Sequence, residues 1–406
     1  MSKLRIALVV QRYGLEVNGG SERLCRMIAE RLARRFHVEV LTTCAIDYVS
    51  WKNEYPPGLA VVNQIPVRRF PVDRPRDPQE FDQFSAWIFS QPHTPEDELH
   101  WVRLQGPCSS DFLSYLKANR QQYDGFVFFT YLYLTTCLGL PLVKDRALLV
   151  PTAHDELPIY LGIYDQVFRA ARRLLFCTKE EQDFVLRRFC LDEASGETVG
   201  VGVEPGAPRS PEDFRREFRA RLGNSQLITY VGRIDESKGC RTMIDFFSRY
   251  LSERPSRDVK LVLIGKAVMP VPNHPSIVHT GFIAEHLKDS AIQASRLLIM
   301  PSPYESLSLA VLEAWTMQKP VLVNGHCEVL RGQCSRSSGG LWYSNYEEFR
   351  ECFDRLLTDD ALCWALGNQG FAHTLQNYTW ERVDERYSRA LSQLPSCTGA
   401  APVLGA

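Results

Sequence analysis

The sequence lacks an excess of charge of either sign and any long apolar run. Its 406 residues contain 47 Lys and Arg against 48 Asp and Glu, a net charge of −1, which gives no overall attraction to nucleic acid or to an anionic membrane. No stretch reaches the roughly 18 apolar residues that a transmembrane helix needs. The apolar run near the N-terminus covers only Ile6 to Val10, which is too short for a secretion signal and predicts a buried first strand. We therefore expect a soluble globular protein without a nucleic-acid partner.

The sequence also lacks the spacings of a metal site or a disulfide framework. Its 12 cysteines are scattered between Cys25 and Cys397 without a Cys-x-x-Cys pair, and its 9 histidines show no zinc-type spacing. We expect reduced thiols in a reducing compartment, no cofactor and no bound metal. No Gly-x-Gly-x-x-Gly follows the first strand of either half, which argues against a nicotinamide-dependent dehydrogenase.

What is present is an alternation of strand and helix patterns. The chain opens with a strand at 4–10, a glycine loop, a helix at 21–35 with its apolar side chains on one face, and a strand at 38–42. This order predicts a parallel sheet with right-handed crossovers. Further strands are predicted at 125–130, 147–151 and 174–178.

Other segments of the first half have their own signatures. Residues 72–106 are rich in proline, charge and aromatic side chains, and we expect either a helical insertion or a flexible excursion there. Thr178 and Glu181 form a Thr-x-x-Glu capping box, which predicts a helix that runs to about Phe189. The Gly-, Pro- and Ser-rich stretch 192–212 is the best candidate for a linker between domains.

The second half repeats the alternation more regularly. Ser210-Pro211 starts a helix that Gly223 closes, and an amphipathic helix follows around 243–251. The predicted strands are 227–231, 260–264, 277–280, 297–300, 320–324 and 340–343. We therefore expect an α/β protein of two Rossmann-like domains, 1–195 and 205–380, that face each other across a cleft. A C-terminal helix at 381–394 is expected to pack back on the first domain, and a mobile tail is expected at 395–406.

In each half, one short motif follows the first strand. Gly19 and Gly20 open a helix, where the backbone can approach a ligand and free N–H groups can bind an anion, although a plain turn explains the pair equally well. Arg233 and Lys238 follow the strand that ends near Gly232, at the edge of the sheet where α/β proteins bind ligands. Two cations there suit a diphosphate, and two solvated surface charges are the alternative.

The segment from Pro301 to Ala314 carries the strongest signal. Its helix, expected from about Leu307, is apolar nearly all round and therefore buried, yet Glu305 and Glu313 bracket it. Buried carboxylates are costly unless they are paired or functional. A rise of roughly 12 Å over eight helical residues makes a glycosidase pair, whose carboxylates lie roughly 5–9.5 Å apart, unfavourable, so we expect separate roles for the two glutamates.

Together these motifs resemble glycosyltransferase family 4, whose members are retaining enzymes with the two-domain GT-B fold. The resemblance rests on Gly-Gly-x-Glu, Gly-Arg-x4-Lys-Gly and Glu-x7-Glu in this order, and it covers roughly 4–50 and 147–393. It implies a transfer of a hexosyl group from a UDP- or GDP-sugar donor to a saccharide, lipid-linked or small-molecule acceptor, with retention and without a metal. The absence of an Asp-x-Asp triplet agrees with the last point.

The resemblance also implies roles for single residues. Arg233 and Lys238 match the pair that neutralises the donor diphosphate, and the backbone N–H groups of Ser306 and Leu307 are expected to join them. Glu305 and His154 match the catalytic residues that face the donor sugar. The remaining donor-binding matches are Glu313 on the ribose hydroxyls, Gly19 and Gly20 beside the diphosphate, and Phe282 near the base.

Several alternatives stay open at this point. His154 could instead be a satisfied histidine at a strand end, and Phe282 could pack in the core. The chain could be a non-catalytic partner subunit of the same fold or a sugar-nucleotide epimerase. The expected location is the cytoplasm or the inner face of the membrane, where Arg169, Arg172 and Arg173 could make a peripheral contact or form a solvated helix face.

Overall fold

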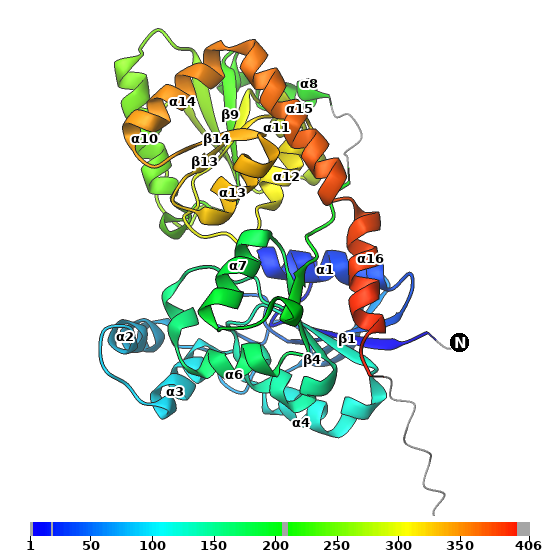
Figure 1. Ribbon diagram of the computed structural model, residues 1–406. Helices are drawn as coiled ribbons and strands as arrows, with labels where there is room; N and C mark the ends of the chain where they lie inside the picture. Colours follow the sequence, from blue (N-terminus) through cyan, green and yellow to red (C-terminus); the bar gives the residue numbers. More distant parts are fainter. Residues whose placement is uncertain (1–2, 18, 205–209, 396–406) are drawn as a thin grey trace, which may run out of the picture. The chain divides into compact units, whose positions relative to one another are not determined.

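The computed structural model describes residues 3–17, 19–204 and 210–395 and divides the chain into two compact units (Figure 1). The first unit comprises the chain up to Val199 together with the residues from Asp384 onward, and the second comprises Gly200–Val383. Each unit has its own sheet, parallel at its centre, and its own buried apolar core. The prediction of an α/β protein with two Rossmann-like domains is therefore confirmed. The remainder of the expected tail, 396–406, lies outside the described residues.

The first unit is built on an eight-stranded sheet of order β3-β4-β2-β1-β5-β6-β7-β8. All neighbouring strands are parallel except β3, which pairs antiparallel with β4. The strands are β1 Arg5–Val9, β2 His37–Thr43, β3 Gly58–Val62, β4 Ile65–Phe70, β5 Gly125–Phe129, β6 Ala147–Val150, β7 Arg173–Phe176 and β8 Gly196–Thr198. The helices are α1 Gly20–Leu32, α2 Pro78–Ile88, α3 Pro95–Gln105, α4 Ser110–Asn119, α5 Leu134–Gly139, α6 Ile163–Ala170 and α7 Lys179–Arg188.

Most first-half predictions are confirmed, and the exceptions lie at the sheet edges. The strands at the centre of the sheet were predicted because their side chains are buried on both faces and read as unbroken apolar runs. The hairpin β3–β4 was missed because β3 is an edge strand whose Leu59 and Val61 are exposed. Strand β8 lies inside the stretch assigned to a linker. The segment 72–106 contains α2 and α3, which confirms a helical insertion, and Figure 1 shows these helices together at one end of the unit.

The second unit has a six-stranded, fully parallel sheet of order β11-β10-β9-β12-β13-β14. Its strands are β9 Gln226–Val231, β10 Val259–Ile264, β11 Ile277–Gly281, β12 Leu297–Met300, β13 Val321–Asn324 and β14 Gly340–Tyr343, so all six predictions are confirmed. Its helices are α8 Pro211–Glu217, α9 Arg219–Leu222, α10 Cys240–Glu253, α11 Glu285–Ala294, α12 Leu309–Thr316, α13 Glu328–Ser337, α14 Tyr346–Thr358 and α15 Asp360–Asn377. Ser210 caps α8 as expected, and Gly223 ends α9 with φ +57°.

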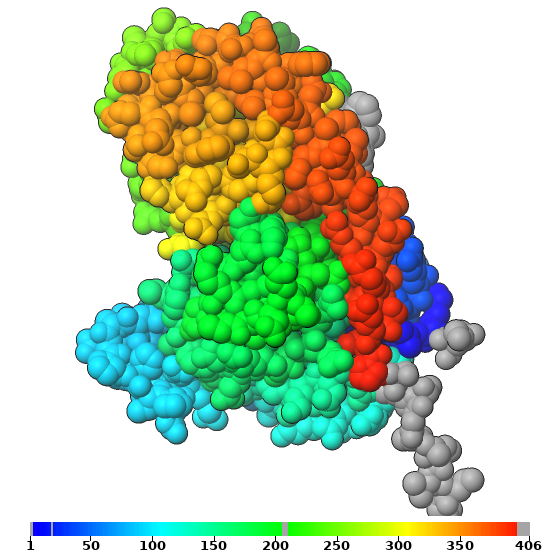
Figure 2. Space-filling model, viewed as in Figure 1, coloured from blue at the N-terminus to red at the C-terminus, as the bar shows by residue number. Residues whose placement is uncertain are grey.

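Helix α16, Trp380–Ser392, begins in the second unit, and its residues from Asp384 onward belong to the first. In the first unit Arg386 donates a hydrogen bond to the carbonyl of Val199 at 2.9 Å, and Arg389 pairs with Glu197. Tyr387 is fully buried. Figure 2 shows this helix, in red, lying along the surface of the first unit. The residues of α16 from Asp384 onward are therefore an integral part of the first unit.

We expect Tyr387→Ala to loosen the edge of the first sheet. Removing a large buried ring costs on the order of 3 kcal/mol, because a cavity replaces its contacts. The measurement is hydrogen–deuterium exchange of the amides of β7 and β8, which we expect to accelerate, with Glu385→Ala on the exposed face of α16 as the matched control. Equal exchange in both variants would contradict a stabilising role for the helix.

Candidate active site

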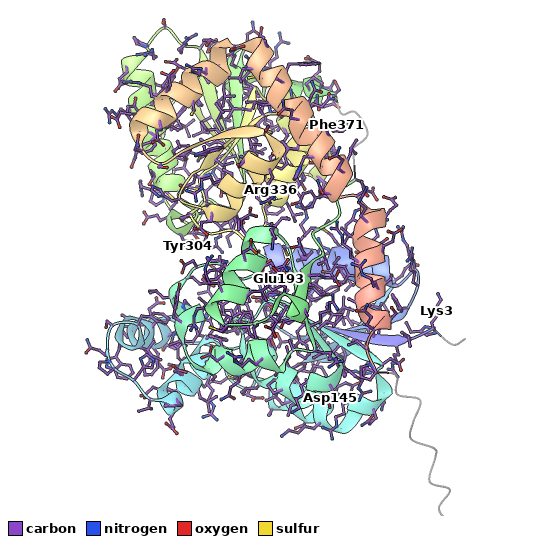
Figure 3. The ribbon with its side chains drawn as sticks, in the orientation of Figure 1. Lys3, Asp145, Glu193, Tyr304, Arg336 and Phe371 are labelled. Carbon is purple, nitrogen blue, oxygen red and sulfur yellow. The ribbon has the colours of Figure 1, made fainter. Side chains whose placement is uncertain are left out.

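In the second unit, two strand-end loops bring a lysine and a glutamate together. Lys238 follows β9 and Glu305 follows β12, and these neighbouring parallel strands end at the same edge of the sheet. The Lys238 Nζ atom lies 2.9 Å from the Glu305 Oε1 atom and 3.5 Å from the carbonyl oxygen of Tyr304. Their side chains are 34% and 16% exposed, so the pair is shielded and still reachable by a ligand. Figure 3 labels Tyr304 in this loop.

Arg233 adds a second cation to the same edge. Its Nε atom lies 2.8 Å from a carboxylate oxygen of Asp235, whose other oxygen accepts the Ser237 N–H at 2.9 Å. Burial alone raises the pKa of Asp235, but the Ser237 N–H and the charge of Arg233 outweigh it and lower that pKa. The guanidinium is therefore oriented by an ionised neighbour and remains partly exposed.

A glycine allows the two loops to approach. Gly239 has φ +73°, and a Cβ atom there would lie 2.3 Å from the carbonyl oxygen of Pro301. A side chain at 239 would therefore push the Lys238 loop away from the Glu305 loop. In the Gly-Arg-x4-Lys-Gly motif, the last glycine is therefore required for packing, whereas the arginine and the lysine supply charge.

Glu313 has its own partner on a neighbouring helix. Its Oε2 atom lies 2.9 Å from the Lys288 Nζ atom of α11, and Lys288 also contacts Glu285 at 3.1 Å and Asp289 at 3.5 Å. Burial, together with the negative charges of Glu313 and Glu285, raises the pKa of Asp289. Lys288 was not among the residues predicted from the sequence, because there it is one ordinary charge on an amphipathic helix.

The start of α12 corrects one expectation. The helix begins at Leu309, with the Ser308 hydroxyl as the N-cap that accepts the Val311 N–H at 3.5 Å. The prediction of a helix from about Leu307 was wrong, because Ser308 has the capping side chain in the right place. Ser306 and Leu307 lie in the turn that precedes the helix, and their predicted contact with a diphosphate stays a prediction.

Phe282 is 71% exposed and follows Gly281, which has φ +71°, at the end of β11. This exposure excludes the alternative that Phe282 packs in the core. An exposed ring at a strand end is available to stack on a planar ligand.

In the first unit, Gly19 caps α1 and Gly20 is its first residue. A buried ion pair supports this turn, since Arg12 Nε donates to Glu22 Oε1 at 2.8 Å and Gln11 Nε2 donates to the same oxygen at 2.8 Å. Arg12 also donates to the carbonyl of Ile46 at 2.7 Å. Arg12, which ties the glycine turn to the loop after β2, was not predicted from the sequence.

His154 lies in the loop after β6. Its Nε2 atom is 3.2 Å from Glu156 Oε2, and Glu156 Oε1 accepts the hydroxyl of Tyr131 at 2.8 Å. The imidazole is partly exposed. The structure thus gives His154 an acidic partner that orients it, which suits both a satisfied histidine and a ligand-binding one.

A buried carboxyl lies behind the His154 loop. Glu181 accepts the N–H of Ala153 at 2.7 Å and the N–H of Cys177 at 2.6 Å, while its own N–H donates to the Thr178 hydroxyl, which confirms Thr178 as the cap of α7. Burial raises the pKa of Glu181 to about 8, although these N–H donors oppose the shift. This residue fixes the backbone next to His154 from a position that no ligand reaches.

Other predicted features have a plain structural account. Arg169 donates to the carbonyl of Phe189 at 2.6 Å, and Arg173 lies 3.1 Å from Glu197, so both side chains are engaged within the first unit. In the described ranges no three His, Cys, Asp or Glu side chains are grouped as a metal site. No helix in the described part of the chain combines the length and the apolar character needed to cross a membrane.

The chain is similar to several known proteins in sequence and in fold. Residues 225–359 match the family model described as glycosyl transferases group 1. The chain is 22% identical to an uncharacterized glycosyltransferase of Methanocaldococcus jannaschii over 94% of this chain and 96% of the relative. Its fold is similar to that of sucrose-phosphate synthase from Thermosynechococcus elongatus, with a TM-score of 0.71, 17% identity and coverage of 97% and 99% of the two chains. It is also similar to an Anabaena protein solved in complex with UDP and glucose, with a TM-score of 0.68, 16% identity and coverage of 96% and 100%.

These similarities establish the fold of the chain. The chain has the fold of the GT-B glycosyltransferases, and the match at 225–359 covers the segment that holds Arg233, Lys238, Glu305 and Glu313. The sequence and fold similarities together support a glycosyltransferase.

We expect Glu181→Gln to remove a pH dependence of stability. The pKa of Glu181 is raised from 4.5 to about 8 on folding, so its contribution is complete below pH 4.5 and is lost as the pH rises through about 8. The free energy of unfolding of the unmodified protein should therefore fall relative to the variant across this window, by at most about 1.4 kcal/mol per pH unit. Urea unfolding at several pH values measures the difference, and parallel curves would contradict the assignment.

Proposed function

We propose that the protein is a family 4 glycosyltransferase that transfers a hexosyl group from a nucleoside-diphosphate sugar to an acceptor hydroxyl, with retention and without a metal. The observation that carries the proposal is the Lys238–Glu305 pair. Lys238 is a cation suited to a leaving diphosphate, and Glu305 is a carboxylate suited to a sugar; the two residues are 67 positions apart in the sequence. A donor that offers a diphosphate to Lys238 and a sugar to Glu305 can separate the pair.

The donor diphosphate is proposed to bind Arg233 and Lys238. In the structure each cation holds a carboxylate, of Asp235 and Glu305 respectively. A diphosphate provides oxygen acceptors of the same charge sign, so it can take the place of Glu305 on Lys238 while Arg233 binds it with the part of its guanidinium that Asp235 leaves exposed. Two fixed cations supply the charge that a metal would otherwise provide.

The nucleoside is proposed to lie between Glu313 and Phe282. Glu313 accepts hydrogen bonds from the ribose hydroxyls, and the exposed ring of Phe282 stacks on the base. Lys288, 2.9 Å from its carboxylate, holds Glu313 in place. UDP or GDP is the proposed carrier, and the Anabaena neighbour solved with UDP and glucose supports the first.

The proposed glycosyl transfer depends on the charges of Arg233, Lys238 and Glu305. The acceptor hydroxyl oxygen bonds to the anomeric carbon, while the bond from that carbon to the diphosphate oxygen breaks and the diphosphate leaves with the electron pair. Arg233 and Lys238 stabilise the negative charge that develops on the leaving group, and Glu305 stabilises the positive charge on the sugar. The diphosphate accepts the proton of the acceptor hydroxyl. His154, oriented by Glu156, is assigned to the hydroxyls of the donor sugar.

We propose a reducing compartment, the cytoplasm, as the location. All eleven cysteines in the described part of the chain are free thiols, eight of them buried. Reduced buried thiols are typical of cytosolic proteins.

Lys238→Ala and Glu305→Gln are expected to differ in character. The first removes a charged hydrogen bond to the diphosphate and weakens nucleotide binding by about tenfold or more. The second frees Lys238 for the phosphate, so binding is retained or tightened, while kcat falls by about a hundredfold because a transition-state interaction is lost. Calorimetric nucleotide binding and turnover with a sugar acceptor measure the two effects.

The matched control is Glu236→Gln, which makes the same chemical change at an exposed position beside the loop. Near-normal turnover of Glu305→Gln would refute its catalytic assignment.

A thermal-shift series with UDP, GDP, ADP and dTDP, each with magnesium and with a chelator, tests the donor site. A nucleotide at 100 times its Kd stabilises by about 2.7 kcal/mol, which raises Tm by a few degrees. We expect one nucleotide to raise Tm equally with the chelator, and less in Glu313→Ala. Stabilisation by none would favour a non-catalytic partner subunit, and turnover of a nucleotide sugar without an acceptor would favour an epimerase.

A further inference from the structure

Glu98 of the helical insertion holds the end of the loop that carries His154. Glu98 lies on α3 and is buried, and His93 lies 3.2 Å from its Oε1 atom. The same Oε1 atom accepts the Gly162 N–H at 2.9 Å, and the Oε2 atom accepts the Ile163 N–H at 2.7 Å. These N–H groups stand at the start of α6, whose N-cap residue, Gly162, has no side chain to accept them. A carboxylate of the insertion therefore supplies the cap that α6 lacks in its own sequence.

The other end of this loop, residues 151–162, is also held by a buried carboxyl group. Glu181 accepts the Ala153 N–H at 2.7 Å, one residue before His154. Thr152 has φ +47°, a conformation that a β-branched residue rarely adopts, and such strain persists only where the surrounding structure holds it. Two acidic side chains from different helices thus fix the loop, one at each end.

Between these ends, the orientation of His154 depends on residues that pack against α6. The imidazole Nε2 atom lies 3.2 Å from Glu156, and Glu156 in turn accepts the hydroxyl of Tyr131 at 2.8 Å. The Tyr131 ring packs edge-on against the ring of Tyr164 on α6, with centroids 4.8 Å apart. A shift of α6 therefore reaches the imidazole through Tyr131 and Glu156, as well as through the backbone of the loop.

The two helices of the insertion share a small aromatic core of their own. The ring of Trp101 on α3 lies 5.6 Å from the ring of Phe81 on α2 and 5.6 Å from that of Phe89, which follows α2. The Trp101 indole N–H also donates to the Ser85 hydroxyl of α2 at 2.9 Å. Because α2 and α3 are joined in this manner, a contact that α3 makes with the rest of the unit is a contact of the whole insertion.

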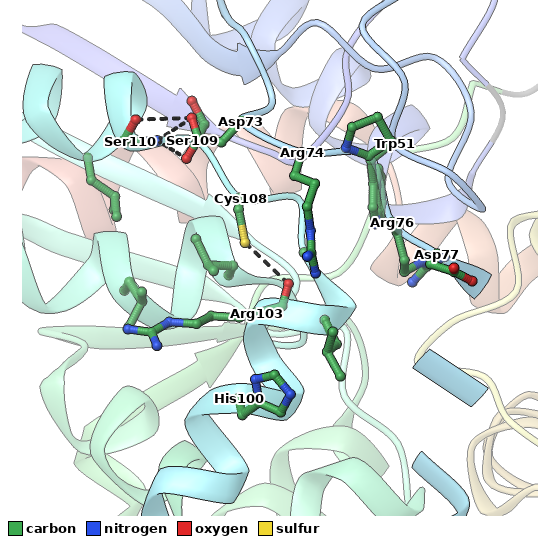
Figure 4. Close-up of a pocket in the computed structure, with 16 residues that line it drawn as sticks. Trp51, Asp73, Arg74, Arg76, Asp77, His100, Arg103, Cys108, Ser109 and Ser110 are labelled. Atoms are coloured by element: carbon green, nitrogen blue, oxygen red, sulfur yellow. Dashed lines mark hydrogen bonds between the residues drawn. The ribbon is translucent and has the colours of Figure 1, made fainter. Parts of the chain in front are cut away.

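A cavity of about 470 Å³ interrupts the packing of α3 on the unit (Figure 4). His100 and Arg103 of α3 line it, and its wall also includes Leu113 of α4 and Leu134 of α5. Because no side chain fills this volume, α3 has fewer contacts with the unit on this side. Glu98 lies outside the lining, and its two hydrogen bonds to the start of α6 connect α3 directly to the end of the loop.

We propose that the helical insertion positions the His154 loop, with Glu98 as the positioning residue. The proposal rests on the proposed function for the role of His154, but the support of the loop by Glu98 does not. An imidazole that contacts a reacting sugar must be placed accurately, because a shift of about 1 Å can cost roughly a hundredfold in rate. The insertion lies outside the segments that resemble family 4, so this support belongs to a part of the chain that the resemblance does not cover.

Hydrogen–deuterium exchange of the full chain tests whether Glu98 holds the loop. Glu98→Ala removes both acceptors, and we expect the amides of residues 153–161, which Glu98 does not bond directly, to exchange at least about tenfold faster. Glu98→Gln keeps an acceptor for one of the two N–H groups and should have a smaller effect. Glu96→Ala, at an exposed position of the same helix, is the matched control and should leave these amides unchanged. Equal exchange in Glu98→Ala and Glu96→Ala would overturn the proposal.

Turnover kinetics show whether this support acts through His154. We expect Glu98→Ala to lower kcat by about tenfold or more. The Kd of UDP or GDP should not change, because Arg233 and Lys238, which are proposed to bind the diphosphate, lie in the second unit. In a His154→Ala background, Glu98→Ala should cause no further loss of kcat, since a residue that acts through the imidazole has no effect once the imidazole is gone. Losses that multiply in the double variant would indicate a general structural role and would refute the positioning of His154.

The two measurements also separate this proposal from the proposed function. Exchange requires no substrate, so faster exchange of the loop in Glu98→Ala, in a protein that turns over no nucleotide sugar, would support the positioning role and contradict the glycosyltransferase. Normal turnover of Glu98→Ala in an active enzyme would leave the proposed function intact and overturn the role of Glu98.

Discussion

The ion pair between Lys238 and Glu305 is the contact on which the account of the second unit depends. It joins the loops after two neighbouring strands, and Gly239 permits the close approach that the pair requires. Isolated pairs at this exposure contribute little to stability, because solvent screens them and the side chains lose freedom. The importance of this pair lies in its position, since it places one cation and one carboxylate side by side at the carboxyl edge of the sheet.

A similar arrangement recurs across both units. Lys288 holds Glu313, Arg12 holds Glu22, and backbone N–H groups hold the buried Glu181 behind the His154 loop. In each case a carboxylate that would be costly to bury alone has a partner that fixes its orientation. These partners come from other elements than the carboxylates do, so the fold is what assembles them.

The sequence predicted the centre of each sheet and left out its edges and partners. Strands such as β9 and β10 are covered on both faces and read as apolar runs, whereas β3 exposes Leu59 and Val61 and turns into β4 through Asn63 and Gln64, which lack the glycine of a typical hairpin. The start of α12 was placed two residues early, because the capping role of the Ser308 hydroxyl was not foreseen. Arg233, Lys238, Glu305 and Glu313 were found from spacing and resemblance, but Lys288, Arg12 and Glu98 needed the three-dimensional structure.

The most direct measurement is a crystal structure of the protein with the nucleoside diphosphate that binds it. The Lys238 Nζ atom now lies 2.9 Å from Glu305 Oε1. In the complex we expect this nitrogen to lie within hydrogen-bond distance, about 2.7–3.2 Å, of a phosphate oxygen, with Arg233 on the same diphosphate and Glu305 released toward the sugar side. A diphosphate bound elsewhere, with the Lys238–Glu305 pair intact, would contradict it.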